Sequence, residues 1–423
     1  MSTATCRLCG AALHHTFIDL GLSPLCEAFV PEERRNMMEP FFPLHVWVCS
    51  ACFLVQLEEY ARPDEIFSEY AYFSSFSESW LAHARRYVER VSERFGLGPE
   101  SHVVEIASND GYLLQFFVER GIPVTGIEPA ANVAEAARAK GVPTEVRFFG
   151  RETAAALAAQ GIAADQMVAN NVLAHVPDIH DFVGGVPVLL KPEGVATFEF
   201  QHLLRMVQGN QFDTIYHEHF CYLSLIAVRE LMGRHGLRVF DVEELSTHGG
   251  SLRVYVCHEG ASHRETEAVA RVAGLEEAEG LRRLDWYSGF ASRVDAVKYG
   301  LIEFLIDARR RGKTVAGYGA PGKGNTLLNY CGIKSDLLPF TVDRNPYKHG
   351  RYCPGSRIPI YPVERLIAAQ PDYVLIMPWN LRDEIMMQMR EIAAWGGQFV
   401  VAIPSLQCHE PPAAPVAQEE RIQ

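Results

Sequence analysis

Strand-like apolar runs alternate with Ala-rich helical patterns through the middle of the chain. The runs are VVEIA, VTGIEPA, DQMVANNV and GVATFEF. Such alternation is typical of a parallel sheet covered by helices. Two adjacent strand-like runs follow, LRVFDVEEL and SLRVYVCH, and a second cycle then runs from GKTVAGYGAPGKGN through LPFTVD, DYVLIM and QFVVAI. We therefore expect an α/β protein with two doubly wound, Rossmann-like units.

The length of 423 residues exceeds what one ordinary hydrophobic core accommodates. We expect a small N-terminal zinc-binding module at residues 1–65, a central doubly wound domain at residues 66–260 and a C-terminal Rossmann-like domain at residues 261–410. The tail at residues 411–423 is Pro-rich and polar, so we expect it to be disordered.

The charge balance argues against nucleic acid as a partner. Lys and Arg number 39 against 52 Asp and Glu, which gives a net charge of −13, and no run of basic residues forms a stripe. The N-terminus MSTATCRLCG lacks the charged and apolar regions of a secretion signal, and no apolar stretch approaches the ~20 residues that a bilayer crossing needs. We expect a soluble, cytoplasmic protein without a membrane partner, either a monomer or a weak oligomer.

Four of the ten cysteines form two CxxC pairs, Cys6 with Cys9 and Cys49 with Cys52. In a chain without a secretion signal, this pattern favours a metal over disulfides. Four thiolates close a tetrahedral zinc site and leave no coordination position for water, so the metal should stabilise rather than catalyse. The separation between the pairs exceeds that of a common zinc ribbon, so we expect extra structure in the intervening loop.

A polar turn, EIASNDG, lies between the first central strand and a helical pattern. Its backbone N–H groups can face a ligand, and Glu128 at the end of the next strand is placed to bind ribose hydroxyls. Ala107 and Asn109 stand where such turns usually carry glycine, although Asn tolerates the left-handed backbone region. A generic strand-helix turn is the alternative. The residues expected to bind the nucleoside are Glu105, Ala107, Ser108, Asn109, Gly111 and Glu128.

Three polar residues, Asn170, Asn171 and His175, follow the next strand in VANNVLAHVPD. Ligands of an open parallel sheet bind at the carboxyl ends of its strands, so we expect the two asparagines to contact the same ligand. The alternative is an Asn-rich strand exit with a structurally satisfied histidine.

The segment TIYHEHFCYLSL has neither helical nor strand periodicity. His217 and His219 are two residues apart and not four, as in a metalloprotease helix, so a second metal is disfavoured. We favour acid/base chemistry, because histidine titrates near neutrality and Glu218 can fix its tautomer. A structural polar loop is the alternative, and we expect a new helix from Leu223.

The turn GYGAPG matches the GxGxxG pattern, follows a strand, precedes a helical segment and has Asp343 at the end of the next strand. These are the features of a nicotinamide dinucleotide site. A sugar-linked nucleoside diphosphate fits the same cradle, because a helix N-terminus attracts its diphosphate and Lys323 adds a charge. A purely structural turn remains possible. The residues expected to bind this ligand are Tyr318, Gly319, Lys323, Asn325 and Asp343.

Several motifs together resemble one family across essentially the whole chain: the sugar C-methyltransferases that act on nucleotide-linked 4-keto-deoxysugars in antibiotic pathways. The motifs are CRLCG…CSAC, YAYFSSFSESW, EIASNDGYLL, YHEHFCYLS, THGGSLRVY and GYGAPGKGNTLLNY. The central part resembles the class I methyltransferases. In that fold LRVFDVEEL and SLRVYVCH would be the sixth and seventh strands, and the seventh strand would run in the reverse direction. Among members, the chain looks most like those that methylate C-3 of a dTDP-linked 3-amino-4-keto-2,3,6-trideoxyhexose, with mycarose-type enzymes close.

The resemblance implies S-adenosylmethionine and structural zinc as cofactors and a dTDP-4-keto-deoxysugar as substrate. The ketone acidifies the C-3 hydrogen, a base removes it, and the enolate carbon attacks the sulfonium methyl. The second histidine of the YHEH motif, His219, is the implied base. Glu218 orients it or is itself the base, while Tyr216 and His175 are donors for the enolate oxygen. The alternatives are an NAD-dependent nucleotide-sugar oxidoreductase, an O- or N-methyltransferase, or a zinc-ribbon scaffold.

Four residues, Tyr70, Tyr72, Phe73 and Ser74, lie between the zinc module and the first central strand. A lid over both ligands would have to originate here. We expect Tyr70 to face the sulfonium cation and the other three to cover the sugar. Packing between domains is the alternative.

Overall fold

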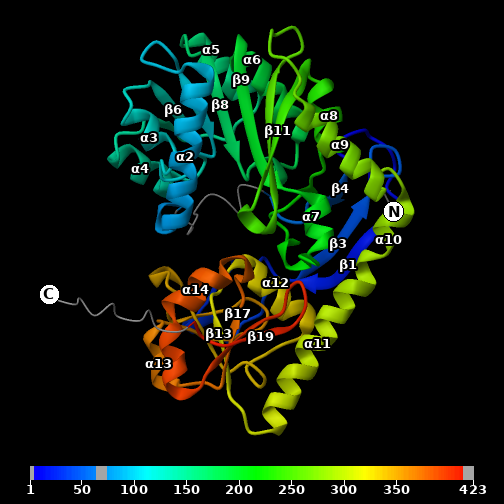
Figure 1. Ribbon diagram of the computed structural model, residues 1–423, viewed down its shortest axis with the longest axis vertical. Helices are drawn as coiled ribbons and strands as arrows, with labels where there is room; N and C mark the ends of the chain where they lie inside the picture. The colour runs from blue at the N-terminus through cyan, green and yellow to red at the C-terminus, as the bar shows by residue number, and fades with distance from the viewer. Residues whose placement is uncertain (1–3, 63–73, 413–423) are drawn as a thin grey trace, which may run out of the picture. The chain divides into compact units, whose positions relative to one another are not determined.

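The structure is a computed structural model that describes residues 4–62 and 74–412, and these residues form two compact units (Figure 1). Unit 1 comprises Met1–Ile18, His45–Met206 and His217–Ser288, and unit 2 comprises Asp19–Leu44, Val207–Tyr216 and Gly289–Gln423. The boundary at Tyr216 falls within the YHEH motif. The domain boundaries expected from the sequence stay a prediction, and Tyr70, Tyr72, Phe73 and residues 413–423 lie outside the described residues.

Unit 1 contains a seven-stranded sheet in the order β11-β12-β9-β8-β5-β6-β7. Five strands pair in parallel, and β12 runs antiparallel to both of its neighbours, so the predicted pair of final strands with the second reversed is confirmed. The strands are β5 (Val103–Ile106), β6 (Val124–Ile127), β7 (Thr144–Glu145), β8 (Ala164–Asn170), β9 (Leu190–Gln201), β11 (Leu237–Leu245) and β12 (Ser251–His258).

Both faces of this sheet are covered, because successive side chains of its strands enter different cores. Val103 packs in a cluster with residues of α2 and α3, whereas Val104 packs in a cluster with residues of α5, α6 and α8. Strands buried on both faces explain the continuous apolar runs in the sequence. The helices are α2 (Glu78–Phe95), α3 (Leu114–Val118), α4 (Ala131–Ala139), α5 (Arg151–Ala159), α6 (Ile179–Leu189), α7 (Leu203–Gln208), α8 (Leu225–Gly233), α9 (Glu267–Glu279) and α10 (Leu284–Ser288).

The helix expected from Leu223 begins two residues later, which corrects the prediction. The hydroxyl of Ser224 caps α8 by accepting the N–H of Ala227, an arrangement that satisfies one of the free donors at a helix start. The two residues before Leu223 form a short strand, β10 (Cys221–Tyr222), which pairs antiparallel with β4 (Val55–Leu57).

Strand β10 completes the four-stranded sheet of the cysteine-rich module, in the order β1-β3-β4-β10. The other two strands are β1 (His15–Ser23) and β3 (Phe42–Val48). The extra structure expected between the CxxC pairs is therefore present. A strand from beyond the YHEH motif thus belongs to the sheet of a module that lies at the start of the chain.

Unit 2 contains a six-stranded sheet in the order β16-β14-β13-β17-β18-β19, parallel except for β19. The predicted second α/β cycle is confirmed. The strands are β13 (Val315–Tyr318), β14 (Thr341–Val342), β16 (Ile360–Tyr361), β17 (Tyr373–Ile376), β18 (Gln398–Val401) and β19 (Gln407–His409), and β2 (Val30–Pro31) pairs separately with β15 (Arg351–Tyr352). The helices are α11 (Phe290–Arg310), α12 (Gly322–Cys331), α13 (Glu364–Ala369) and α14 (Arg382–Gln388).

Short 3-10 helices connect several of these elements. They are η1 (Glu32–Arg34), η2 (Ser74–Phe76), η3 (Leu173–His175), η4 (Phe212–Thr214), η5 (Thr247–Gly249), η6 (Pro346–Lys348), η7 (Trp379–Leu381) and η8 (Arg390–Trp395). Among the described residues, no helix combines the length and the apolar character that a membrane crossing requires.

Candidate functional site

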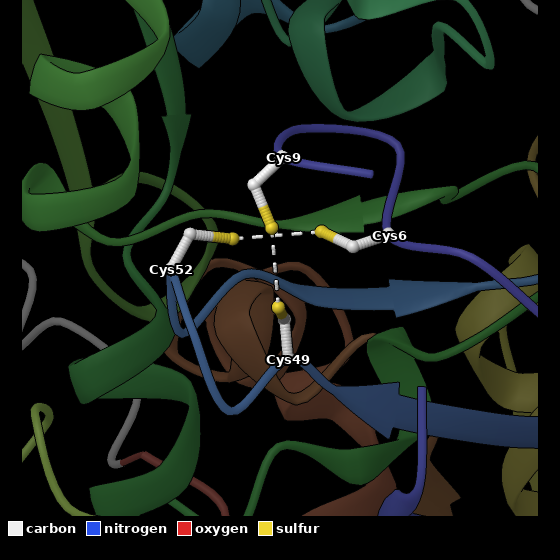
Figure 2. Close-up of side chains that lie close together, drawn as sticks. All are labelled: Cys6, Cys9, Cys49 and Cys52. Atoms are coloured by element: carbon white, nitrogen blue, oxygen red, sulfur yellow. Dashed lines mark hydrogen bonds between the residues drawn. The ribbon is translucent and has the colours of Figure 1, made fainter. Parts of the chain in front are cut away.

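The four predicted zinc ligands lie together, with their sulfur atoms within 4.8 Å of one another (Figure 2). Sγ of Cys6 lies 3.5 Å from Sγ of Cys52, and Sγ of Cys9 lies 3.5 Å from Sγ of Cys49. A tetrahedral zinc ion with Zn–S bonds of about 2.3 Å separates its sulfurs by about 3.8 Å, so the four thiolates fit the ion. The amide of Gln56 donates to Cys6 Sγ at 3.1 Å and would help to orient that ligand.

The turn after β5 adopts a glycine-type backbone although only one glycine is present. Ala107, Asn109 and Gly111 have φ angles of 53°, 49° and 74°. The sequence allowed this conformation for Asn109, but for Ala107 it is unfavourable by about 1–2 kcal/mol. At Gly111 a Cβ atom would lie 3.0 Å from Cγ2 of Val142, so tight packing favours glycine in addition to the positive φ. The turn therefore has the left-handed backbone conformation that is typical of nucleoside- and dinucleotide-binding turns, although two of its three positions are not glycine.

The carboxylate of Glu128 fixes this turn. Its Oε2 accepts the N–H of Asn109 at 3.0 Å and its Oε1 accepts the N–H of Ala130 at 2.9 Å. Each oxygen keeps a second lone pair that can accept a ribose hydroxyl. Asn109 Oδ1 in turn accepts the N–H of Ser74, so Ser74 lies beside the predicted nucleoside turn. The side chain of Ser108 is buried against Gly126.

Two side chains at the ends of β5 and β8, the buried Glu105 and the half-buried Asn170, have acceptor oxygens with few partners among the described residues: the hydroxyl of Tyr112 is the one donor near the Glu105 carboxyl, and Asn170 Oδ1 receives no hydrogen bond. Burial raises the pKa of Glu105 well above its ordinary value, and the charges of Asp110 and Glu128 add to the shift, while the nearby hydroxyl of Tyr112 opposes it. This edge of the sheet is therefore acidic, desolvated and short of donors. A cationic ligand with N–H groups suits it.

Two histidines predicted for catalysis, His175 and His219, lie edge to face with ring centroids 4.5 Å apart. The N–H of Phe220 donates to the carbonyl of Ala174 at 2.8 Å and ties the two segments together. Burial lowers the pKa of His175 to about 4, although a hydrogen bond with the backbone of Glu218 opposes the shift. His175 is therefore neutral at physiological pH.

Exposure separates the members of the YHEH motif. His217 and Glu218 are buried, at 2% and 4% exposure, whereas Tyr216 and His219 are partly exposed. The structure assigns Tyr216 to unit 2 and the following three residues to unit 1. Of the two acid/base candidates, His219 is the side chain that solvent reaches.

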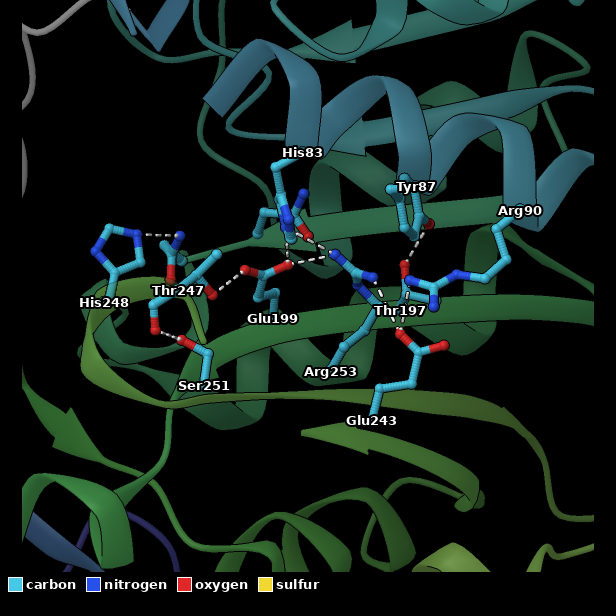
Figure 3. A network of polar contacts seen from close by, with 12 residues as sticks. His83, Tyr87, Arg90, Thr197, Glu199, Glu243, Thr247, His248, Ser251 and Arg253 are labelled. Carbon is cyan, nitrogen blue, oxygen red and sulfur yellow. Dashed lines mark hydrogen bonds and ion pairs between the residues drawn. The ribbon is translucent and has the colours of Figure 1, made fainter. Parts of the chain in front are cut away.

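A buried charge network was missed by the sequence analysis (Figure 3). Glu199, in β9, accepts hydrogen bonds from His83 at 2.9 Å, from Thr247 at 2.9 Å and from Arg253. Although burial alone would raise the pKa of Glu199, the bond from His83 and the charge of Arg253 lower it to about 2. The signal was present in the sequence: a glutamate and an arginine interrupt the apolar strands ATFEFQ and SLRVYV.

Aromatic rings surround this network. Trp80 stacks on His83 at 4.9 Å and on Tyr112 at 5.9 Å, and its edge meets His248 at 5.5 Å. His248 has a φ angle of 52°, and its Nε2 lies 3.3 Å from Nδ2 of Asn171, one of the residues predicted to contact the nucleoside. Motifs SESW and THGG had contributed to the family resemblance without any assigned role.

The glycine-rich turn of unit 2 already carries two carboxylates of the chain. Asp343 Oδ2 accepts the N–H of Ala320 at 2.7 Å. The N–H of Gly322, at the start of α12, bonds to the carboxylate of Glu27, which also lies 3.8 Å from Nζ of Lys348. The position expected for a diphosphate is therefore occupied by a glutamate, and Asp343 holds the turn itself.

The remaining predicted residues of unit 2 also contact the chain's own groups. Lys323 donates to Oδ1 of Asn380 at 2.9 Å and lies 4.8 Å from the ring centre of Trp379. Asn325 donates to the carbonyl of Cys26 at 2.6 Å. Tyr318 is buried at the end of β13, directly before Gly319.

Comparison with known proteins identifies the family. Three family models match the chain: a zinc binding domain at residues 6–67, a methyltransferase domain at residues 80–242 and a C-methyltransferase C-terminal domain at residues 246–404. The C-methyltransferase NovU of Streptomyces niveus is 38% identical over 402 residues, which cover 94% of this chain and 95% of that protein. The chain belongs to the C-methyltransferase family. Its methyl donor is S-adenosylmethionine, and its cysteine cluster is a zinc site.

Solved methyltransferase structures give weaker matches. A methyltransferase of Anabaena variabilis has a TM-score of 0.35 and 15% identity, over 42% of this chain and 86% of that chain. The magnesium protoporphyrin IX methyltransferase of Synechocystis has a TM-score of 0.32 and 14% identity, over 43% and 82%.

The charge network leads to a stability prediction. Replacement of Glu199 by Gln keeps the size of the side chain but leaves the buried Arg253 with Glu243, at 3.1 Å, as its remaining ion-pair partner among the described residues, so the free energy of unfolding should fall by about 1.5–3 kcal/mol at pH 7. Denaturant titration measures this change. Because the pKa of Glu199 is lowered, its contribution is complete above the ordinary value of 4.5 and is lost as the pH falls toward 2, so the two proteins should converge in that window.

The control is Glu119→Gln, which removes the exposed ion pair with Arg85. Such a pair contributes about 0–1 kcal/mol. Equal stability of the two variants would contradict the importance of the buried pair.

Proposed function

We propose that the chain transfers a methyl group from S-adenosylmethionine to C-3 of a dTDP-linked 4-keto-deoxysugar, most specifically a 3-amino-2,3,6-trideoxy-4-keto-hexose, in antibiotic deoxysugar biosynthesis. Methylation of carbon requires a carbon nucleophile, and a hydrogen next to a ketone is acidic enough for a side chain to remove. The observation that carries the proposal is the His175–His219 pair, in which both residues are partly exposed and the imidazole of His175 is held neutral.

We assign the base to His219. A general base must reach the proton that it removes, and His219 is partly exposed whereas Glu218 is buried. Neutral His175 can donate a hydrogen bond to the enolate oxygen without bringing a charge of its own. Tyr216 is the second candidate donor, and Glu218 serves to position the loop.

The acidic edge of the seven-stranded sheet suits the methyl donor. S-adenosylmethionine supplies an electrophilic methyl group and carries a sulfonium and an ammonium. We assign the ammonium to Glu105 and Asn170, whose acceptor oxygens have few donors among the described residues, and the ribose to Glu128. The rings of Trp80 and Tyr112 lie beside this edge and can stabilise a cation.

The glycine-rich turn of unit 2 favours methyl transfer over the rival nicotinamide oxidoreductase. That rival needs a diphosphate at the N-terminus of α12, where the carboxyl group of Glu27 already bonds to the N–H of Gly322 and takes its place. Recognition of the sugar nucleotide then depends on side chains, for which Tyr318, Lys323 and Asn325 remain our candidates.

The test of the proposed function is the product. Incubation with a panel of dTDP-4-ketosugars and S-adenosylmethionine should add one methyl group to the 3-amino substrate, and proton and carbon NMR should locate it on C-3. A methyl group on oxygen or nitrogen would contradict C-3 transfer. Binding of NAD without binding of S-adenosylhomocysteine would establish the rival.

The base assignment leads to a kinetic prediction. His219→Asn keeps polarity but removes the proton affinity, so the rate should fall by on the order of 10²–10⁴. Binding of S-adenosylhomocysteine, measured by calorimetry, should be unchanged. His14→Asn, at an exposed position, is the control with the same substitution. A near-native rate for His219→Asn together with an inactive Glu218→Gln would transfer the role to Glu218.

The raised pKa of Glu105 leads to a linkage prediction. Without ligand the carboxyl is protonated below its raised pKa, and an ammonium favours its ionised form, so binding of S-adenosylhomocysteine should release protons and tighten as the pH rises. Calorimetry in two buffers of different ionisation enthalpy measures the release. Glu105→Gln should abolish it and weaken binding about 10- to 100-fold, since hydrogen bonds to charged groups contribute about 1.5–3 kcal/mol. Glu119→Gln should change neither, and proton release that persists in Glu105→Gln would contradict the assignment.

A further inference from the structure

Arg7 stands between two zinc ligands, Cys6 and Cys9, and makes contacts that the zinc site itself does not require. Its guanidinium donates to the carbonyl of Pro177 at 2.7 Å and to the carbonyl of Leu57. The same group lies over the ring of Phe220, 5.4 Å from the centre. One side chain therefore joins three segments that are far apart in the sequence.

Two of these contacts flank the histidine pair. Pro177 lies two residues beyond His175, and Phe220 directly follows His219. The third contact, Leu57, donates its own N–H to the carbonyl of Phe220 at 3.0 Å. The planar guanidinium group of Arg7 thus contacts the segments that carry His175 and His219. Its geometry allows it to donate to two carbonyl groups at once.

Gln56, in β4, adds further contacts between the zinc ligands, Arg7 and β10. Its amide donates to Cys6 Sγ at 3.1 Å and accepts the N–H of Arg7 at 2.9 Å, while its backbone pairs with Cys221 of β10. A zinc ion that fixes Cys6 and Cys9 would therefore also fix the position of the Arg7 side chain relative to β4 and β10.

We propose that Arg7 is a positioning residue for the His175–His219 pair, and that the zinc module supports proton abstraction by holding this arginine in place. The inference rests on the proposed function for its kinetic part only. A displacement of about 1 Å of a catalytic group can lower a rate by about 10²-fold, so the loss of this clamp should be visible in the chemistry even where the fold survives.

The test compares Arg7→Met with Arg238→Met. Arg238 also binds three backbone carbonyls, those of Glu259, Ala261 and His263, but no contact links it to the histidine pair within the described residues. Both variants lose a structural clamp, and only the first loses contacts beside the histidines. Arg238→Met therefore reports what a merely structural role would do.

With zinc content unchanged at one ion per chain by metal analysis, Arg7→Met should lower the methylation rate about 10- to 100-fold, while S-adenosylhomocysteine binds as before. Exchange of the C-3 hydrogen in deuterated water, with S-adenosylhomocysteine present, should fall in parallel because it isolates proton removal. Arg7→Lys keeps the charge and one carbonyl contact, and should recover part of the rate. Arg238→Met should leave both rates unchanged.

A readout without substrate separates this inference from the proposed function. In protein labelled at histidine, with signals assigned through His175→Asn and His219→Asn, the imidazole resonances of the pair should move in Arg7→Met and stay in Arg238→Met. Unmoved resonances, a rate equal to that of Arg238→Met, or zinc lost in proportion to activity would each overturn the positioning role.

Discussion

The antiparallel pairing of β4 with β10 is the interaction on which the arrangement of the histidines depends. Cys221 pairs with Gln56 and Tyr222 with Val55, and the N–H of Leu57 donates to Phe220 just after the YHEH motif. The partners are far apart in the sequence, so this ladder forms only when the cysteine module and the methyltransferase sheet fold together. Their apolar residues accordingly share one core, in which Leu8 and Leu54 lie in the same cluster as Phe220. A module this small has little core of its own, and a closed zinc site compensates.

The carboxylates of the seven-stranded sheet show how environment decides the use of one residue type. Glu199 and Glu105 are both buried in strands, yet the pKa of Glu199 is lowered and that of Glu105 is raised. The difference lies in their partners. Glu199 receives hydrogen bonds from His83 and Arg253, so its charge is balanced within the fold. Glu105 has two carboxylates and the hydroxyl of Tyr112 nearby, and no cation among the described residues opposes its charge, so a cationic ligand is what can balance it. Glu199 is therefore part of the structural core, whereas Glu105 is the carboxyl group whose charge a cationic ligand would stabilise most.

Periodicity and spacing predicted the features that short segments determine. The apolar runs gave most strands of both sheets, but not β7, β16 or β19, and CxxC spacing gave the zinc ligands. The reversed strand followed from the resemblance to the class I methyltransferases. The sequence did not predict the left-handed backbone of Ala107, because its local preference opposes that conformation and only the surrounding fold imposes it. Nor did it predict β10 or the partners of Arg253, because each depends on residues from another part of the chain. The charged residues inside apolar strands were visible, but their pairing was not.

The glycine-rich turn of unit 2 shows that a sequence pattern can predict a local backbone shape without predicting the ligand that binds there. GYGAPG, the strand before it and Asp343 after it satisfy a dinucleotide pattern, since the pattern specifies a backbone shape and a free helix N-terminus. The shape is present, with Gly319 at a φ angle of 86°. The N-terminus is not free: the N–H of Gly322 bonds to Glu27, and a Cβ on Gly322 would lie 3.1 Å from that carboxylate. A carboxylate satisfies the helix dipole as a phosphate does, so the glycines here are explained by close approach of the chain to itself. A match to the pattern establishes the turn, and what occupies it must be learned from the residues that fold against it.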